Sequence, residues 1–285
     1  MSVDKYIEFN GNEYRFLKKM GNSYSSEVYK LASKGTNYVM KISYNQMAYD
    51  TEKIILEELQ KQNFRAPTII GETFYNDKNA IIMSFLGGSS AESIVLTPKI
   101  VQNMVNTINE FNNMKIDRKG ITIYNFDTIL DKYKRNIDII GAYLSSSTYC
   151  KIQEQTDYLL ELLSKQSYNK LIHRDIRLGN LLIEEEEVYM IDFEGCAIGN
   201  AIMDLVKIYY EIKAKDTKMA KFFMNEYLTI NCMENDEVVE LLNAYTIVDK
   251  INTVVWCVDR NRVGSTFFEK TIYDLVRILM KKERF

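Results

Sequence analysis

Two short segments carry polar side chains whose types and spacing suit the transfer of a phosphoryl group. Asp175 and Asn180 lie five residues apart on one segment, and Asp192 follows on the next. Phosphoryl transfer requires a carboxylate that orients and deprotonates the attacking hydroxyl, and oxygen ligands for the magnesium ion that bridges the phosphates. Aspartate and asparagine oxygens suit this hard cation. A loop with Asp175 and Asn180, faced by Asp192 at the end of a hairpin, would place base and metal on either side of the phosphate.

The composition predicts a globular protein with a sizeable core. The chain has 285 residues, which suits one large domain or two lobes. Apolar residues make up 46% of it and charged residues 26%, and the net charge is −3. Because Lys and Arg are scattered among Asp and Glu, we expect no basic field that would attract nucleic acid or an anionic membrane.

The first residues and the cysteines favour a cytoplasmic location. The N-terminal segment contains an acidic residue and no apolar run, unlike a signal peptide. No stretch reaches the roughly 18 apolar residues of a membrane span. None of the four cysteines forms a C-x-x-C pair, and there is a single histidine, so we expect reduced thiols and no zinc site.

The first ninety residues have the pattern of a small antiparallel sheet with one helix. Runs rich in β-branched and aromatic residues, separated by turn-forming residues, predict strands at residues 13–20, 27–33, 37–43, 68–75 and 79–85. Between about residues 46 and 62 the apolar period becomes helical. Gly87–Ser90 follows the last strand and is the best candidate for a hinge.

The remainder of the chain is mainly helical in pattern. Thr97 and Pro98 form a helix start, a hydroxyl cap followed by proline at the first helical position. That helix is expected to end near Met114, and residues 181–193 are expected to form a small hairpin. Further helices are expected over residues 126–143, 149–166, 200–213, 217–229, 235–257 and 267–283. The predicted fold class is α+β and bilobal, with a β-rich lobe at residues 1–86 and a larger helical lobe at residues 87–285.

The segments that carry the aspartates resemble known kinase motifs. They read LIHRDIRLGNLL and VYMIDFEG. They resemble the protein-kinase signature H-R-D-L-x-x-x-N followed by D-F-G. The resemblance is closer to the aminoglycoside phosphotransferase and choline kinase family, which reads H-G-D-(L/I)-H-P-G-N-(I/L)-L and then I-D-(W/F)-E. Gly179–Asn180 and Ile191–Glu194 match that family, whereas its glycine, histidine and proline are replaced by Arg174, Arg177 and Leu178.

This resemblance implies a protein-kinase-like fold and assigns roles to both segments. Asp175 corresponds to the catalytic base, and Asn180 and Asp192 correspond to the magnesium ligands. Arg177 is expected to contact the γ-phosphate. Glu194 is a further candidate metal ligand, because in some relatives of this fold the glutamate of such a D-x-E helps bind the metal.

Two further polar residues correspond to structural supports in the family. His173 resembles the residue that braces the catalytic loop, and we expect no acid–base role for it despite the near-neutral pKa of histidine. Asp204 lies on an otherwise apolar helix, where an unpaired carboxylate would be costly to bury. The family has an aspartate there that supports the catalytic loop.

A separate N-terminal segment resembles the phosphate-binding elements of kinases. The glycine-rich loop G-x-G-x-x-G-x-V has the register Gly21-x-Ser23-x-x-Ser26-x-Val28 here. Serine replaces two glycines, and its hydroxyl and backbone N–H can still reach phosphate oxygens. The run Tyr38-Val39-Met40-Lys41 resembles the V-A-I-K strand, whose lysine holds the α- and β-phosphates.

The lysine of that strand needs an acidic partner on the following helix. Glu52, Glu57 and Glu58 are candidates. The family commonly has a proline after this helix, and counting back from Ala66–Pro67 favours Glu52. The other two are then expected to be solvated helix charges.

The nucleotide base is expected at the end of the last predicted strand. In the kinase fold this position is the hinge, whose backbone N–H and C=O groups bind adenine. Ser84 and Leu86 occupy it here, and Met83 would guard the pocket behind it.

Taken together, the resemblance implies a magnesium-dependent O-phosphotransferase that uses ATP or GTP. The expected acceptor is a small hydroxylated molecule, such as an aminoglycoside, an amino alcohol or a sugar, and can be cationic. A monomer or a homodimer is expected. One alternative is a protein Ser/Thr kinase, favoured by His173–Asp175 but opposed by Glu194 and by the short stretch Gly195–Asn200. The other is a non-catalytic nucleotide-binding pseudokinase, opposed by the presence of the phosphate and metal residues.

Overall fold

A computed structural model of the chain describes residues 6–22 and 25–280. The chain forms two compact units. The first comprises Met1–Thr122 together with His173–Cys196, and the second comprises Ile123–Ile172 together with Ala197–Phe285. The predicted catalytic segments therefore belong to the same unit as the predicted nucleotide-binding strands. The lobe boundary predicted between residues 86 and 87 stays a prediction.

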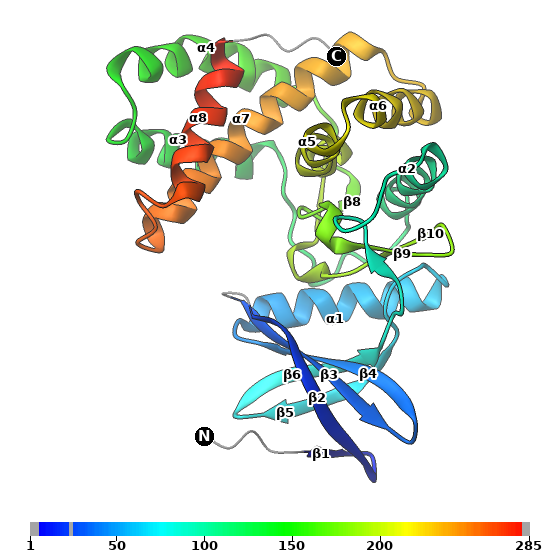
Figure 1. The fold of residues 1–285 in the computed structure, drawn as a ribbon. Helices are drawn as coiled ribbons and strands as arrows, with labels where there is room; N and C mark the ends of the chain where they lie inside the picture. The colour runs from blue at the N-terminus through cyan, green and yellow to red at the C-terminus, as the bar shows by residue number, and fades with distance from the viewer. Residues whose placement is uncertain (1–5, 23–24, 281–285) are drawn as a thin grey trace. The chain divides into compact units, whose positions relative to one another are not determined.

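The first unit contains an antiparallel sheet of six strands among the described residues, in the order β1-β2-β3-β4-β6-β5 (Figure 1). Its strands are β1 (Tyr6–Phe9), β2 (Asn12–Asn22), β3 (Ser26–Ser33), β4 (Thr36–Ser43), β5 (Ile69–Tyr75) and β6 (Lys78–Ser84). The sheet curls so strongly that its two edge strands meet. A Cβ atom added to Gly71 of β5 would lie only 2.0 Å from the ring of Phe9 in β1. The five predicted strands are confirmed, and β1 is an additional strand.

Helix α1 (Gln46–Lys61) packs against β4, β5 and β6 (Figure 1). It begins at Asn45, whose side chain accepts a hydrogen bond from the backbone N–H of Ala48. This is the usual way to satisfy a free N–H at a helix start. Its buried face includes Ile55, Leu56 and, unusually for an acidic residue, Glu52. Helix α1 therefore brings a carboxylate into the interior of the first unit.

A glycine-containing linker joins β6 to a second, three-stranded sheet of order β10-β9-β7. Its strands are β7 (Ser89–Ser90), β9 (Leu181–Glu184) and β10 (Glu187–Met190), so the predicted hairpin is confirmed. A Cβ atom on Gly88 would lie 2.8 Å from the carbonyl oxygen of Ile183, so only glycine allows this approach to β9. Helix α2 (Pro98–Asn112) follows; Thr97 caps its start by accepting from the N–H of Ile100, and α2 packs on β10.

The second unit is mainly helical (Figure 1). Its helices are α3 (Phe126–Gly141), α4 (Ser146–Ser164), α5 (Leu205–Lys215), α6 (Thr217–Asn231), α7 (Asn235–Asp259) and α8 (Thr266–Met280). Helix α7 is buried along most of its length and contacts α3, α4, α5 and α8. The strands β8 (Lys170–Ile172) and β11 (Ala197–Gly199) form a short antiparallel pair. Within residues 6–22 and 25–280, no helix combines the length and the hydropathy needed to span a bilayer.

Candidate active site

The first unit contains a mostly apolar cavity of about 350 Å³. Val28 and Val39 line it from the six-stranded sheet, and Leu182 lines it from the three-stranded sheet. Lys41 and Asp192 also line it, so charged groups meet the apolar wall. The volume and the mixture of apolar walls with a few polar groups are typical of a small-molecule site.

The predicted hinge residues Met83, Ser84 and Leu86 line this cavity. Met83 is buried, as expected of a residue that closes the pocket from behind. The N–H of Ser84 donates to the carbonyl oxygen of Thr68 at 2.9 Å, and the Ser84 hydroxyl accepts from the N–H of Thr68 at 2.9 Å. The N–H and the hydroxyl of Ser84 are thus already engaged within the protein, and the binding of a base by the predicted hinge stays a prediction.

The predicted phosphate loop is described in part. Gly21, Ser26 and Val28 line the cavity, and Gly21 pairs with Val28 where β2 meets β3. A Cβ atom on Gly21 would make only ordinary contacts with Val28, at 3.9 Å. The fourth predicted residue of the loop, Ser23, lies outside the described residues.

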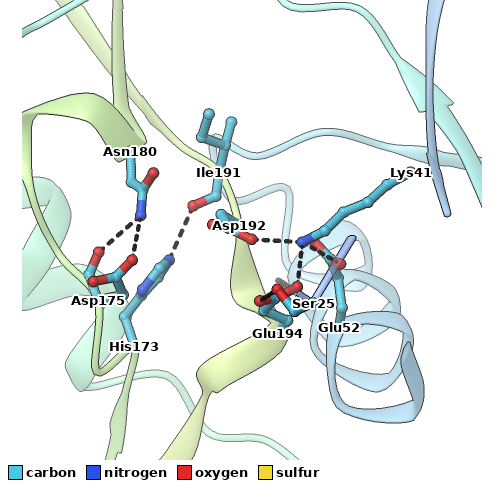
Figure 2. Close-up of polar contacts among 9 residues, drawn as sticks. All are labelled: Ser25, Lys41, Glu52, His173, Asp175, Asn180, Ile191, Asp192 and Glu194. Atoms are coloured by element: carbon cyan, nitrogen blue, oxygen red, sulfur yellow. Dashed lines mark hydrogen bonds and ion pairs between the residues drawn. The ribbon is translucent and has the colours of Figure 1, made fainter. Parts of the chain in front are cut away.

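Three carboxylates converge on the ammonium group of Lys41 (Figure 2). Lys41 Nζ lies 2.5 Å from Asp192, 2.8 Å from Glu52 and 3.0 Å from Glu194. Lys41 is 5% exposed and Glu52 is 2% exposed, so these two are held away from water, whereas the side chains of Asp192 and Glu194 are partly exposed. Glu58, another candidate partner, pairs instead with Lys61 on the helix surface. Three negative charges against one positive charge leave an excess of about two negative charges.

The local charges shift the pKa values of the cluster in different directions. Burial lowers the pKa of Lys41, but attraction to Glu52, Asp192 and Glu194 outweighs burial and raises it. Burial raises the pKa of Glu52, and Lys41 offsets this only in part. Burial would raise the pKa of Asp192 too, but charge attraction and the hydrogen bond from Lys41 lower it overall. Lys41 and Asp192 are therefore a charged pair at neutral pH.

The predicted catalytic segment is ordered by short hydrogen bonds from Asn180 and His173 (Figure 2). Asn180 Nδ2 donates to the carbonyl oxygen of Asp175 at 2.9 Å and to its carboxylate at 3.1 Å. His173 Nε2 donates to the carbonyl oxygen of Ile191 at 3.0 Å, because a carbonyl can only accept. The ring of His173 packs 5.2 Å from that of Phe193. His173 is thus a buried brace that ties the catalytic segment to the residue before Asp192.

Two residues of the site adopt left-handed backbone conformations. The φ angles are 67° at Arg174 and 72° at Asp192. Such angles are uncommon outside glycine and are concentrated at functional sites, where the surrounding contacts must hold them. At Asp192 the left-handed turn ends the extended run after β10 and accompanies the contact of its carboxylate with Lys41.

Arg177, the predicted phosphate contact, is exposed. Its guanidinium lies against Gly179, where an added Cβ atom would be 3.4 Å from one terminal nitrogen. The carboxylate of Glu92 approaches the same glycine at 3.6 Å. The positive charge of Arg177 also contributes to the lowered pKa of Asp192. Arg177 is therefore near enough to Asp192 to act on the same charges.

One contact was not predicted from the sequence. The hydroxyl of Ser25 donates to Glu194 Oε1 at 2.5 Å, across 169 positions of the chain (Figure 2). The glycine-rich register selects Ser23 and Ser26 and passes over Ser25. Only the folded chain shows which serine of this run meets Glu194.

Comparison with known proteins assigns the chain to a family. The sequence model of the phosphotransferase enzyme family matches residues 17–235. The chain belongs to this family. Its match covers the predicted phosphate loop, Lys41, the predicted hinge and both predicted catalytic segments. The predicted class, a small-molecule kinase, is confirmed at the level of family and fold. No curated protein sequence matches the chain significantly.

Solved structures show the fold. A thermostable mutant of aminoglycoside phosphotransferase APH(4)-Ia has a TM-score of 0.73 at 14% identity, covering 93% of this chain and 95% of that one. Spectinomycin phosphotransferase APH(9)-Ia, in complex with ADP and spectinomycin, has a TM-score of 0.65 at 15% identity, covering 95% and 93%. Amicoumacin kinase hAmiN, in complex with AMP-PNP and Ca²⁺, has a TM-score of 0.67 at 12% identity, covering 93% and 87%. The predicted α+β, kinase-like fold is confirmed.

The residues around Lys41 fit a divalent cation that is held together with a nucleotide. The excess negative charge calls for a further cation, and Glu194 Oε2 is buried without a hydrogen-bond partner. Asn180 turns its Nδ2 to Asp175, which leaves its oxygen free to coordinate. No group of three or more His, Cys, Asp or Glu side chains in the described part of the chain could hold a metal by itself. Magnesium typically takes one or two carboxylates and completes its ligands with substrate phosphates and water.

Proposed function

We propose that this protein is a magnesium-dependent O-phosphotransferase that transfers the γ-phosphoryl group of ATP to a hydroxyl of a small molecule. The observation that carries the proposal is the cluster around Lys41: Glu52 and Asp192 meet its ammonium group at the wall of the cavity, and Glu194 pairs with the same group. Membership of the phosphotransferase enzyme family supports it. A single buried lysine with excess carboxylates suits a site that receives both phosphates and a cation.

Lys41 is the proposed ligand of the donor phosphates. Glu52 is buried on α1 and keeps the ammonium in place at 2.8 Å. Asp192 lines the cavity and Glu194 is partly exposed, and both leave Lys41 when phosphate oxygens take their place. Mg²⁺, held by Asn180, Asp192 and Glu194, would neutralise the phosphate charge that develops during transfer. Gly21, Ser26 and Val28 belong to the loop that covers the phosphates, to which we also assign Ser23.

Asp175 is the proposed catalytic base. Asn180 Nδ2 holds its carboxylate at 3.1 Å, which fixes the oxygen that faces the acceptor hydroxyl. The acceptor oxygen forms a bond to the γ-phosphorus, the bond from that phosphorus to the β–γ bridging oxygen breaks, and Asp175 takes the hydroxyl proton. The exposed guanidinium of Arg177 is available to the transferred phosphoryl group.

The apolar part of the cavity is the proposed site of the purine base. Val28, Val39 and Leu182 offer faces against which a flat ring can pack, and Leu86 offers backbone groups. Structures of this fold contain ADP or AMP-PNP. We therefore propose an adenine nucleotide as the donor, with GTP as the alternative.

The proposed acceptor is a small hydroxylated molecule of the aminoglycoside, amino alcohol or sugar class, which can be cationic. The compared structures include complexes with spectinomycin and with hygromycin B. Glu194 in place of the glycine of D-F-G, and the short stretch after it, favour such an acceptor over a protein. The monomeric or homodimeric state and the cytoplasmic location stay predictions.

The test is a direct search for the product. The protein is incubated with Mg-ATP and a panel of aminoglycosides, amino alcohols and sugars, and the acceptors are analysed by mass spectrometry. The proposal predicts that one class gains a single phosphate group, in step with ADP formation and only when a divalent cation is present. Phosphate on generic protein substrates and on no member of the panel would overturn the small-molecule assignment.

A further inference from the structure

Glu194 is held by two groups that approach its two carboxylate oxygens separately (Figure 2). Ser25 donates to Oε1 at 2.5 Å, and Lys41 lies 3.0 Å from Oε2. The backbone around Glu194 is also constrained, because Phe193, its neighbour in the same turn, is fully buried against His173. The carboxylate of Glu194 can therefore reorient only by rotation about its own side-chain bonds. The hydrogen bond from Ser25 limits that rotation.

Ser25 is itself held in place. Its carbonyl oxygen accepts a hydrogen bond from the N–H of Tyr44 at 2.7 Å, which anchors it to the residue after β4. Strand β4 also carries Lys41. Ser25 and Lys41 thus approach Glu194 from neighbouring parts of the same sheet.

The two oxygens of Glu194 differ in what remains available to a ligand. Oε1 has its hydrogen bond from Ser25, whereas Oε2 is buried and lacks a hydrogen-bond partner. A buried carboxylate oxygen without a hydrogen bond is costly to maintain. Among the described residues, the charge on Oε2 is offset by Lys41 alone, and Lys41 is shared with Glu52 and Asp192. Oε2 is therefore the oxygen that a cation would take.

We infer that Ser25 is a positioning residue for metal binding: its hydroxyl fixes Glu194 so that Oε2 faces the site of a divalent cation. This inference rests on the proposed function, because it assumes that a cation enters with the nucleotide. Ser25 keeps its bond to Oε1 while Oε2 moves from Lys41 to the cation, and Lys41 is then free for phosphate oxygens. Groups that orient a metal-binding carboxylate typically change metal affinity by about 10- to 100-fold when they are removed.

The measurement is the affinity for AMP-PNP by calorimetry, once with Mg²⁺ and once with EDTA. The inference predicts that Ser25→Ala weakens binding with Mg²⁺ about tenfold and leaves binding in EDTA unchanged. Ser25→Thr keeps a hydroxyl and restores binding with Mg²⁺. Ser33→Ala is the matched control, because the Ser33 hydroxyl also donates, to the carbonyl oxygen of Glu13 at 2.6 Å, but at the far end of β3.

A double-mutant comparison separates an effect through Glu194 from a general effect on the loop. Because Ser25 acts through Glu194, Ser25→Ala should cost little further affinity when Glu194→Gln is already present. Equal losses from Ser25→Ala with Mg²⁺ and with EDTA, or full additivity with Glu194→Gln, would overturn the inference and leave the proposed function intact. Wild-type protein that binds AMP-PNP equally well with and without Mg²⁺ would instead overturn the metal role in the proposed function, and the inference with it.

Discussion

Replacing Lys41 by methionine should destabilise the first unit strongly at neutral pH. The substitution keeps the length of the side chain but removes the positive charge that, among residues 6–22 and 25–280, is the only one within ion-pair distance of Glu52. Glu52 is 2% exposed and has Asp192 and Glu194 close by, so its charge would be left buried and repelled. Removing one partner of a buried ion pair typically costs about 3–5 kcal/mol. We expect a loss of that size in the free energy of unfolding.

The size of this loss should depend on pH. In the variant, burial and the neighbouring carboxylates keep the folded-state pKa of Glu52 above its unfolded value of about 4.3. A carboxyl whose pKa is higher in the folded state does not destabilise the protein at pH values below its unfolded pKa. The destabilisation grows as pH rises from the unfolded pKa to the folded pKa. The deficit relative to the wild type should therefore be smaller at pH 5 than at pH 8. In the wild type, the lowered pKa of Asp192 contributes stability at neutral pH that is lost as pH falls through that value.

The assay is urea unfolding followed by circular dichroism, combined with hydrogen exchange of the α1 amides. The single tryptophan, Trp256, lies on α7 in the second unit, so its fluorescence does not report on this site directly. Lys53→Met is the matched control, on helix α1 next to Glu52, because Lys53 pairs with Glu72 at 2.7 Å in a partly exposed position. Such a pair contributes about 0–1 kcal/mol. Equal losses in the two variants at pH 8, or a larger deficit for Lys41→Met at pH 5, would refute the reasoning.

Two further predictions concern the metal site and the linker. Asp192→Asn should keep the left-handed turn, because asparagine tolerates that conformation. The variant should show a smaller thermal stabilisation by Mg-AMP-PNP than the wild type. It should bind metal-free AMP-PNP at least as well, because one negative charge is removed. An unchanged magnesium-dependent shift would contradict the metal role. Gly88→Ala should destabilise by about 1–3 kcal/mol, because the new methyl group would meet the backbone of Ile183 at 2.8 Å. Gly11→Ala is the control for backbone strain without a contact, because Gly11 has a φ of 70° and no atom lies within 4 Å of an added Cβ there. A smaller effect of Gly88→Ala than of Gly11→Ala would refute the contact argument.

Local patterns predicted most of the elements because they were strong. The strand that carries Lys41 is rich in aromatic and β-branched residues, and Thr97–Pro98 marks a helix start that the structure places at the same residues. The helix predicted over residues 200–213 is divided, because Asn200 caps a separate 3₁₀ turn, Ala201–Asp204, before α5 begins. Strand β1 was missed because four residues carry too little periodicity to stand out.

The site was predictable where spacing along the chain reflects proximity in space. Asp175 and Asn180 are five residues apart, so one loop brings them together. The partner of Lys41 required a choice among three glutamates, and the helical period with the position of Pro67 favoured Glu52. Contacts between segments that are distant in the sequence cannot be inferred from residue spacing. The contact between Ser25 and Glu194 could therefore not be predicted.

The measurement that tests the central claim most directly is the turnover of Asp175→Asn beside the wild type. Both are assayed for phosphate transfer to the acceptor identified in the panel, and both are titrated with Mg-AMP-PNP. The substitution keeps a side chain of the same shape that can still accept from Asn180 Nδ2, so the loop and the nucleotide affinity should be preserved. A general base typically contributes about 10²–10⁴-fold to the rate, and we predict a loss of kcat in that range at unchanged affinity. Turnover equal to that of the wild type would contradict the assignment of Asp175 and the account built on it.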